Sequence, residues 1–322
     1  MSAPRRPPIP LRECVVVVTP RSFGLHDPGL RERLEAAVGE VRYHPGPLPA
    51  DRLAPLLADA DGLLAGLDEI TARVLEGATR LRVIARYGVG ADRIDLAAAA
   101  ARGVVVTVTP GANANAVAEL AIAFVFALAR PIVQGRAAAR EGRWPAMPGM
   151  EVAGRTLGVV GLGRIGSLVA HKARALGMRV LAHDPLVRES EDAEVVALAA
   201  LLPECDFVSL HATLTSETRG LVRRDLLERL KPGAVLINTA RGELIDEQDL
   251  ISALDAGHLR AAALDVLAEE PPRPDHPLLA RDDVLITPHM GPHTAESMNA
   301  MGRIASEDLI TVLSGGAPRY PL

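Results

Sequence analysis

The sequence predicts an α/β protein built from two doubly wound parallel sheets. Its 322 residues exceed the roughly 250–300 at which one hydrophobic core stops growing, so two domains are expected. Short β-branched runs alternate with helical stretches over the first hundred residues, and a second series of the same kind starts near Thr156. Strands that alternate with helices imply crossover units and a parallel sheet covered on both faces.

The expected elements follow from these runs. In the first series the predicted strands are "CVVVVT", "EVRYH", "GLLAG", "LRVIARYG" and "VVVTVT", and the predicted helices are "GLRERLEAAVG", "DRLAPLLADA", "ITARVLEGA" and "DLAAAAARG". In the second, the predicted strands are "TLGVVGLG", "MRVLAHD", "DFVSLHAT", "AVLINTA", "RAAALDV" and "DVLITPH", with a helix ending at Gly177 after the first of them.

Two long helices complete the prediction. Between the two series, "PGANANAVAELAIAFVFALARP" predicts a helix that is apolar on every side and is therefore expected to be buried between domains or subunits. After the second series, "TAESMNAMGRIASEDLITVLSGG" predicts a closing helix that ends at two glycines.

Composition and charge exclude several classes of function. Apolar residues make up 48% and charged residues 23%, as in a packed globular protein, and the net charge of −5 without a basic block argues against nucleic acid as a partner. Cys14 and Cys205 follow no metal or disulfide spacing, so both are expected to be buried and reduced. "MSAPRRPPIPLREC" lacks the apolar stretch of a signal peptide, and no run reaches about 18 apolar residues, so we expect a cytoplasmic protein without a membrane partner.

A glycine motif indicates a nucleotide site. Gly161, Gly163 and Gly166 lie directly after a predicted strand and open a helix, where such glycines allow a tight turn and close approach of the backbone to a pyrophosphate. Alone, the pattern fits any strand-to-helix turn equally well. Asp184 ends the next strand, where a carboxylate accepts hydrogen bonds from the ribose diol and repels a 2′-phosphate, which favours NAD over NADP. Arg188 nearby leaves NADP open.

Two charged residues after later strands are candidates for a functional site, and each also fits an ordinary surface role. Arg241 in "NTARGELIDE" lies at a strand end and is able to hold a carboxylate through two N–H groups, but it also fits a surface ion pair. Glu270 in "ALDVLAEEPP" precedes two prolines, as solvated turns often do.

His289 and His293 in "LITPHMGPHT" have the spacing of a helical zinc pair. Gly291 and Pro292 break the helix that such a pair needs, and neither cysteine is near in sequence, so no metal site is expected. A lone structural or surface histidine is the alternative for either position.

Taken together, the glycine motif with Asp184, "NTARGELIDE", "ALDVLAEEPP" and "ITPHMGPHT" resemble the D-isomer-specific 2-hydroxyacid dehydrogenase family, and most of all its phosphoglycerate dehydrogenase-like members. "RYGVGADRIDL" and "TPGANANAVAELAI" extend the resemblance to nearly the whole chain. It implies a Rossmann NAD-binding domain, 111–293, inserted into a flavodoxin-like substrate domain, 1–110 and 294–322, with a catalytic cleft between the two.

The resemblance also implies roles for single residues. His289 would exchange a proton with the substrate oxygen, Glu270 would fix the imidazole tautomer and stabilise its charged form, and Arg241 would orient the 2-oxo acid. The substrate carboxylate would be bound by the backbone of a loop in the first domain, with Arg86 beside it. The loop consists of Tyr87, Gly88, Val89 and Gly90. "GVG" also suits a plain turn.

For the cofactor NAD, the resemblance implies a larger set of residues along the strand ends of the second domain. These are Gly161, Gly163, Arg164, Ile165, Gly166, Asp184, His211, Thr213, Thr239 and Asp265. The chain departs from the family in two places. Thr213 and Ser216 stand where proline is usual, which predicts a looser loop. Gly66 stands where serine-pathway phosphoglycerate dehydrogenases carry an arginine for the substrate phosphate.

The expected function is therefore that of an NAD-dependent D-2-hydroxyacid dehydrogenase, or 2-oxoacid reductase, acting on a small 2-hydroxy or 2-oxo acid. D-3-phosphoglycerate dehydrogenase, glyoxylate or hydroxypyruvate reductase, and a non-catalytic NAD(H)-sensing protein are the alternatives. Phosphite oxidation is disfavoured because Val89 replaces that activity's lysine. Family members pair through the apolar helix, 116–129, and the loop around Trp144, which predicts a homodimer.

Overall fold

The computed structural model describes residues 9–322. The first eight residues, on which part of the signal-peptide argument depends, lie outside the described residues. The chain divides into two compact units: unit 1 comprises Met1–Asn113 and His293–Leu322, and unit 2 comprises Ala114–Pro292. Unit 2 is therefore inserted into unit 1 along the sequence.

Unit 1 contains a five-stranded parallel sheet with the order β2-β1-β3-β4-β5, which is the flavodoxin-like order. Its strands are β1 Val15–Val18, β2 Glu40–Tyr43, β3 Gly62–Ala65, β4 Val83–Arg86 and β5 Val105–Thr107. Its helices are α1 Gly29–Ala37, α2 Ala50–Leu53, α3 Ala72–Gly77, α4 Leu96–Ala101 and α11 Ala295–Leu313, with short 3-10 turns at Leu11–Glu13 and Ala54–Leu57. The doubly wound parallel sheet predicted for the first series is confirmed.

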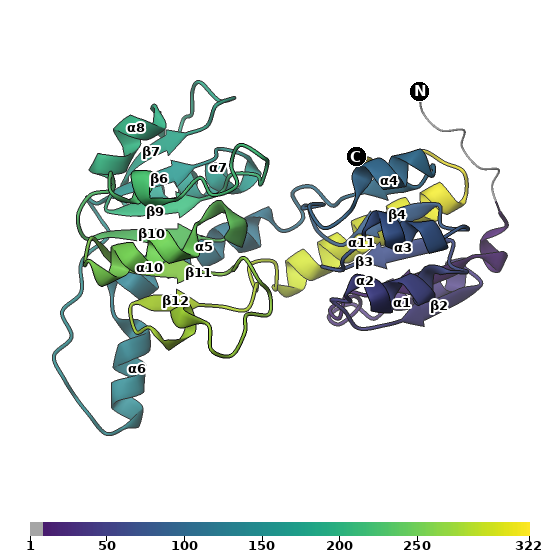
Figure 1. Ribbon diagram of the computed structural model, residues 1–322, viewed down its shortest axis with the longest axis horizontal. Coiled ribbons are helices and arrows are strands. Elements are labelled where there is room, and N and C mark those ends of the chain that lie inside the picture. The colour runs from purple at the N-terminus through teal and green to yellow at the C-terminus, as the bar shows by residue number, and fades with distance from the viewer. Residues whose placement is uncertain (1–8) are drawn as a thin grey trace. The chain divides into compact units, whose positions relative to one another are not determined.

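Helices cover both faces of this sheet (Figure 1). α1 and α11 pack on one face, with Phe23, Leu34 and Leu309 fully buried there, and α2, α3 and α4 cover the other. The stretch predicted as one helix, "DRLAPLLADA", instead changes from α-helix to a 3-10 turn at Ala54. Pro55 explains the change, because it lacks the N–H that an α-helix would use at that position.

Unit 2 contains a seven-stranded parallel sheet with the order β12-β11-β10-β9-β6-β7-β8. Its strands are β6 Thr156–Val160, β7 Arg179–His183, β8 Glu194–Val195, β9 Phe207–Leu210, β10 Ala234–Asn238, β11 Leu259–Leu264 and β12 Val284–Ile286. Its helices are α5 Ala114–Ala129, α6 Ile132–Arg140, α7 Arg164–Ala175, α8 Leu198–Leu201, α9 Arg224–Leu227 and α10 Glu247–Asp255, with 3-10 turns at Leu202–Glu204, Gly242–Leu244 and Pro277–Ala280.

The strand order of unit 2 confirms the predicted Rossmann arrangement, because it reverses direction between the neighbours β6 and β9. Open α/β sheets bind ligands at this switch point, outside the carboxyl ends of the strands. α5 and α7 pack on one face, whereas α8, α9 and α10 lie on the other. α5 contacts α7, β10 and β11, so its own unit already buries one side of the helix that the sequence predicts to be apolar all round.

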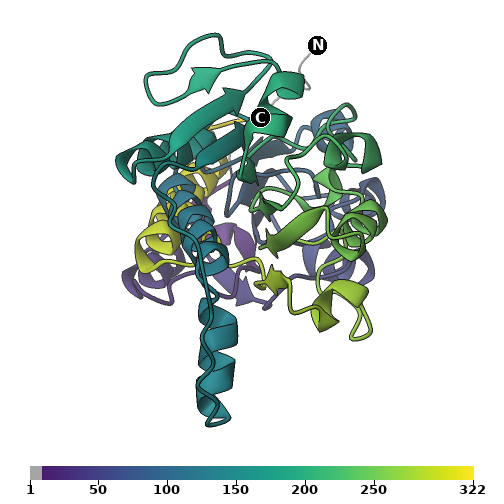
Figure 2. The ribbon, with the colours of Figure 1, turned by 90° about the vertical axis from the view of Figure 1, so that its left-hand side faces the viewer.

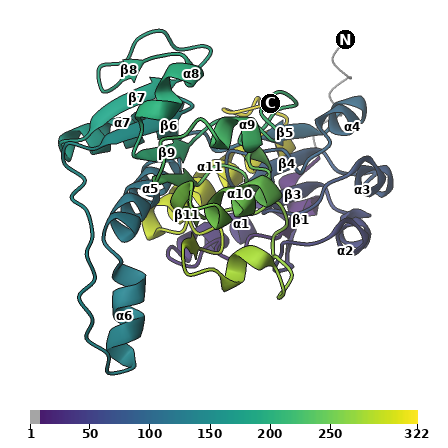
Figure 3. The same cartoon turned by 60° about the vertical axis from the view of Figure 1, so that its left-hand side comes forward.

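An arm, residues 132–150, which begins with α6, projects from the rest of unit 2. Figures 2 and 3 show α6 extending away from the sheet, with the chain that follows it returning alongside. Gln134 donates to the Asp282 carbonyl oxygen at 2.9 Å, and Arg260 donates to the Leu128 carbonyl oxygen at 3.1 Å, so hydrogen bonds hold the base of this arm to the sheet. In residues 9–322 no single helix has the length and apolarity that a membrane crossing needs; α5 and α6 reach them only as a pair, bent by 62°.

Candidate functional site

The glycine turn after β6 has the geometry that a dinucleotide needs. Gly161 has φ +98°, and a Cβ there would lie 2.7 Å from the His211 carbonyl, so a side chain is excluded. A Cβ on Gly166 would lie 1.9 Å from the Gly161 carbonyl oxygen, which makes this glycine necessary for helix–strand packing. A Cβ on Gly163 would meet nothing within 4 Å. The open side at Gly163 is where a pyrophosphate would approach the backbone.

α7 begins at Arg164, directly behind this open side. The first-turn amides, which include those of Arg164 and Ile165, have no acceptor within the helix, and the helix dipole adds partial positive charge there. This combination binds phosphate groups in dinucleotide folds. The residues present therefore fit an NAD pyrophosphate.

Asp184 lies just beyond β7 and is tied to the glycine turn. Its Oδ2 accepts the Leu162 amide at 2.8 Å and its Oδ1 accepts the Leu186 amide at 2.8 Å. Each carboxylate oxygen keeps lone pairs for further donors, such as two ribose hydroxyls. The Asp184 carboxylate is thus fixed in place by backbone groups next to the predicted phosphate site.

His211 follows β9 at the same edge. Its amide donates to the Val160 carbonyl at 2.7 Å, and its Nε2 lies 2.8 Å from the Ser209 hydroxyl. Burial lowers the pKa of His211 to about 4, so the ring is neutral at physiological pH. Its place beside Gly161 suits an uncharged wall of the cofactor site.

The loop that contains Thr213 is held by its own side chains. The Thr218 hydroxyl donates to the Thr213 carbonyl at 2.6 Å and accepts the Thr215 amide at 2.7 Å. Thr213 and Ser216 occupy positions where proline is usual, and the sequence therefore predicts a looser loop. These hydrogen bonds restrain the loop in place of the prolines. Sequence reasoning missed them because hydroxyl-to-backbone turns of this kind have no distinctive spacing.

The turn after β10 presents Arg241. Asn238 donates from its side-chain amide to the Arg241 carbonyl at 2.8 Å and accepts the Ala240 amide at 3.0 Å, which shapes the turn. Thr239 is buried at the same turn. A Cβ on Gly242 would lie 2.0 Å from the Leu267 carbonyl carbon, so only glycine lets this turn contact the segment that carries Glu270.

Asp265 organises the chain around His289. The Asp265 side chain is 1% exposed, and its carboxylate accepts the Met290 and Gly291 amides at 2.8 Å each and the Thr287 hydroxyl at 2.5 Å. Its own carbonyl accepts the His289 amide at 2.9 Å. Burial raises the pKa of the Asp265 carboxyl, and these donors oppose that rise.

His289 itself is paired with Glu270. Its Nδ1 lies 2.7 Å from Glu270 Oε2, with side-chain exposures of 22% and 20%. In residues 9–322 His289 is the only residue other than glycine with a positive φ, +50°, a conformation that persists when surrounding bonds impose it. Because Nδ1 faces the carboxylate, Nε2 is the ring nitrogen left for a substrate.

The predicted carboxylate-binding loop lies in unit 1, at the end of β4. Gly88 has φ +145°, and its carbonyl accepts the Thr109 amide at 2.9 Å. Among the described residues 9–322, the amides of Val89 and Gly90 meet no acceptor, and the Val89 side chain is 43% exposed. Two adjacent amides in this state are available to an anion.

Arg86 and Tyr87 shape that loop from inside unit 1. Arg86 is 8% exposed and donates to the carbonyls of Tyr87 and, at 2.9 Å, Gly90. The Tyr87 hydroxyl donates to the Met298 carbonyl at 2.8 Å, and burial raises its pKa to about 12. Direct contact of Arg86 with substrate therefore stays a prediction.

The sites thus group as follows. Unit 2 brings Arg241, Glu270 and His289 to the carboxyl edge of the sheet that carries the Gly161 turn, and unit 1 carries the Arg86–Gly90 loop. His293, the second histidine of the motif, belongs to unit 1, whereas His289 belongs to unit 2. A nucleotide-binding Rossmann unit with an imidazole–carboxylate pair beside its glycine turn is typical of a dehydrogenase.

Comparison with known proteins identifies the family to which the chain belongs. Residues 122–291 match the family described as D-isomer specific 2-hydroxyacid dehydrogenase, NAD binding domain, and the chain belongs to this family. A glyoxylate reductase of Korarchaeum cryptofilum is 42% identical over 271 residues, 81% of this chain and 82% of that protein. The family membership predicted from the motifs is confirmed, and with it NAD as the cofactor.

Two further relatives extend the similarity. A D-3-phosphoglycerate dehydrogenase of Methanocaldococcus jannaschii is 42% identical over 286 residues, 86% of this chain but 54% of the relative, so the chain spans about half the length of that protein. The crystal structure of the TT0316 protein of Thermus thermophilus has a TM-score of 0.87 and 42% identity, and the match covers 96% of this chain and 99% of that one.

Proposed function

We propose that this chain is an NAD-dependent D-2-hydroxyacid dehydrogenase that reduces a small 2-oxo acid, or oxidises the corresponding 2-hydroxy acid. The observation that carries the proposal is the 2.7 Å pair of His289 Nδ1 and Glu270 Oε2, at the sheet edge that also carries the Gly161 turn. An imidazole held in this way is suited to exchange a proton with a substrate oxygen.

The three residues have separate roles in this proposal. Glu270 accepts the Nδ1 hydrogen, which selects one tautomer and stabilises the charged ring, while His289 Nε2 gives its proton to the keto oxygen. Arg241 binds the substrate carboxylate and polarises the carbonyl, since its guanidinium holds charge at every relevant pH. NADH, when bound, supplies the hydride for the keto carbon.

The loop Tyr87–Gly90 is the proposed anchor for the substrate carboxylate, through the Val89 and Gly90 amides. Its support is the absence, within residues 9–322, of any acceptor for those two amides, together with the positive φ of Gly88. Two backbone donors would bind the anionic end common to all 2-oxo acids, without selecting the acid's side chain.

The substrate is either D-3-phosphoglycerate or a smaller acid without a phosphate group. The surroundings of Gly66 favour the smaller acid. Gly66 has no side chain to meet a phosphate, and its amide is already bonded at 2.9 Å to both the Thr19 hydroxyl and the Asp68 carboxylate. Asp68 is 1% exposed. A carboxylate at this position disfavours a phosphate nearby, which supports glyoxylate or hydroxypyruvate as substrate.

A turnover assay tests the proposal. NADH oxidation is followed with glyoxylate, hydroxypyruvate and 3-phosphohydroxypyruvate, using wild type, His289→Ala and, as a control, His171→Ala, whose ring is exposed on α7 and pairs with Asp192. We expect turnover with at least one acid, a fall of about 100-fold or more in kcat for His289→Ala, and wild-type rates for the control.

If no acid supports turnover above the His289→Ala rate, the proposed function is wrong. NADH binding without turnover, measured by nicotinamide fluorescence, would instead support the NAD(H)-sensing alternative. The acid with the highest kcat/KM shows whether the enzyme prefers the phosphorylated substrate or one of the two smaller acids.

We further propose that the protein is a homodimer and works in the cytoplasm. Support for the dimer comes from the arm, residues 132–150, where apolar side chains are unusually exposed: Ile132 by 56%, Val133 by 49% and Trp144 by 90%. A projecting apolar surface of this kind is typical of a protein interface. For the compartment, the support is that Cys14 and Cys205 are free, buried thiols.

A further inference from the structure

Glu247, the first residue of α10, contacts both ends of the segment that carries Glu270. Its Oε1 accepts the Ala268 amide at 3.0 Å, and its Oε2 lies 3.0 Å from His276 Nε2. The Glu247 side chain is 19% exposed and that of His276 is 12% exposed. One carboxylate therefore closes the loop 268–276 at its beginning and at its end.

This loop determines where Glu270 lies. Glu270 Oε1 accepts the Leu267 amide at 3.1 Å, next to the Ala268 amide that Glu247 binds, while Glu270 Oε2 reaches His289. On its other side, the Leu267 backbone lies so close to Gly242 that no side chain fits there. The contact with Gly242 and the two bonds of Glu247 fix the loop at its beginning and its end. The Glu270 carboxylate between them therefore has little room to shift.

His276 depends on the same carboxylate. Its Nδ1 is buried and has no hydrogen-bond partner among residues 9–322, so Nε2 alone orients the ring. Without Glu247, both ring nitrogens would lack a protein partner, and a buried polar group without one is costly. The ring would then leave its position and release the end of the loop, just before the 3-10 turn Pro277–Ala280.

We propose that Glu247, with His276 as its partner, is a positioning residue that holds the Glu270 carboxylate against the His289 ring. The inference rests on the proposed function, in which that ring exchanges the proton. The sequence analysis assigns no role to Glu247, the last residue of "NTARGELIDE", or to His276. The side-chain hydrogen bonds of Glu247 and His276 go to the Ala268 amide and to each other. The two residues therefore act on Glu270 through the loop 268–276.

The experiment compares Glu247→Ala and Glu247→Gln with Asp249→Asn in the full chain. Asp249 lies in the same first turn of α10, but its carboxylate serves Arg224, so it controls for the loss of a charge there. We measure kcat, the KM values and the pH profile of kcat/KM. Glu270 pairs with His289 and the Asp265 carboxylate lies beside it, and neither residue is substituted in any of the three variants.

We expect Glu247→Ala to lower kcat by about 10- to 100-fold, because displacement by about 1 Å costs this much. The KM for NADH should stay within about twofold, since the glycine turn is untouched. The pH profile of kcat/KM should differ from that of wild type, because the Glu270 carboxylate no longer holds one position against the His289 ring. Glu247→Gln should regain part of the rate, as its amide oxygen still accepts from Ala268.

A second readout does not need turnover. Nitrogen-15 NMR of the histidine side chains, with the His289 signals assigned by His289→Asn, reports the tautomer of that ring. We expect a hydrogen-bonded Nδ1–H in wild type and in Asp249→Asn, and signals averaged between the two tautomers in Glu247→Ala.

The outcomes separate the two ideas. If wild type turns over a 2-oxo acid while Glu247→Ala matches Asp249→Asn in kcat, pH profile and ring signals, the inference is wrong and the proposed function stands. If wild type has no turnover, the proposed function fails. The ring signals then decide the inference, which an unchanged tautomer in Glu247→Ala would overturn.

Discussion

At the scale of single residues, Asp265 and His289 show how one buried carboxylate can set the backbone of a reactive group. Asp265 accepts two amides and a hydroxyl from the turn that carries His289, and its carbonyl accepts the His289 amide. Several bonds thus support the φ of +50° at His289, which costs energy in an isolated chain. This conformation directs the imidazole to Glu270.

Asp184 is the residue on which cofactor choice is expected to depend. We predict that Asp184→Ala lowers the preference for NAD over NADP, measured as the ratio of kcat/KM values, by about 10-fold or more, because the carboxylate both binds the ribose diol and repels a 2′-phosphate. Asp192→Ala, which removes a carboxylate that pairs with His171 and Arg174, is the control. An unchanged ratio in Asp184→Ala would refute this assignment.

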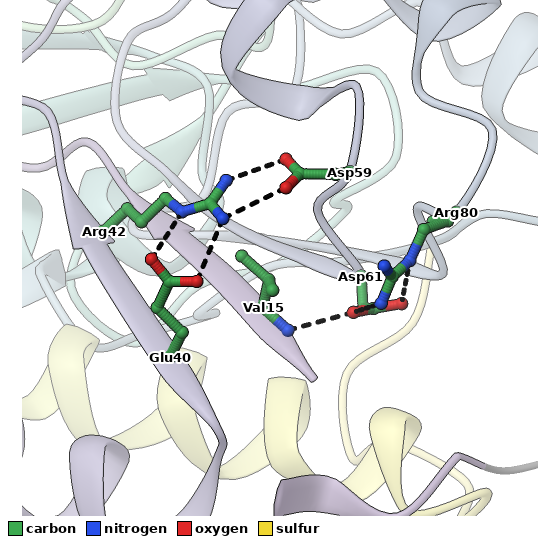
Figure 4. A network of polar contacts seen from close by, with 6 residues as sticks. All are labelled: Val15, Glu40, Arg42, Asp59, Asp61 and Arg80. Atoms are coloured by element: carbon green, nitrogen blue, oxygen red, sulfur yellow. Dashed lines mark hydrogen bonds and ion pairs between the residues drawn. The ribbon is translucent and has the colours of Figure 1, made fainter. Parts of the chain in front are cut away.

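At the scale of elements, Asp61 links the starts of three strands in unit 1. Its side chain is fully buried, and Oδ2 accepts the Val15 amide at 2.9 Å and an Arg80 N–H at 2.8 Å. Its carbonyl accepts the Arg82 amide just before β4, at 2.9 Å. Figure 4 shows this group beside a second, exposed one, in which Arg42 binds Glu40 and Asp59.

The two groups in Figure 4 predict unequal effects on stability. Asp61→Ala should destabilise unit 1 by about 1–3 kcal/mol, because it leaves the partly buried Val15 amide without its acceptor. Asp59→Ala should change little, since its carboxylate is 54% exposed and surface ion pairs contribute weakly. Amide hydrogen exchange of β1 and β3 measures the difference, and equal protection in the two variants would contradict the prediction.

At the scale of the whole molecule, the arm of unit 2 is the surface that the proposed dimer would use. Trp144, on this arm, is 90% exposed. We predict that wild type sediments with the mass of two chains, and that the double variant Ile132→Glu and Trp144→Glu sediments as one. The buried apolar area drives such association, and a charge in the interface opposes it.

Leu25→Glu is the matched control, because Leu25 is 61% exposed in unit 1 and lies outside the arm. It should leave the mass unchanged. A monomeric wild type, or a double variant that stays dimeric, would show that the arm does not form the interface.

Much of this architecture is predictable from local sequence. Each β-branched run of the two series forms a parallel strand, and the glycine turn lies where its spacing places it, because strand propensity and glycine conformation act over a few residues. The helices α6, α8, α9 and α10 were not anticipated. All four have nine residues or fewer, and α6 in addition contains Gly135, so their periodicity is weak.

The sequence by itself determined the two parallel sheets, the family and the residue types of the site, because these depend on short periodic patterns and on motifs. The resemblance implied the pairing of Glu270 with His289, and the structure gives it at 2.7 Å. Only the tertiary structure decided that Asp265 holds the turn that carries His289, and that Glu247 and His276 close the loop. These contacts join residues roughly 20 to 30 positions apart. Their partners are chosen by the packing of separate strands and helices, which no local pattern encodes.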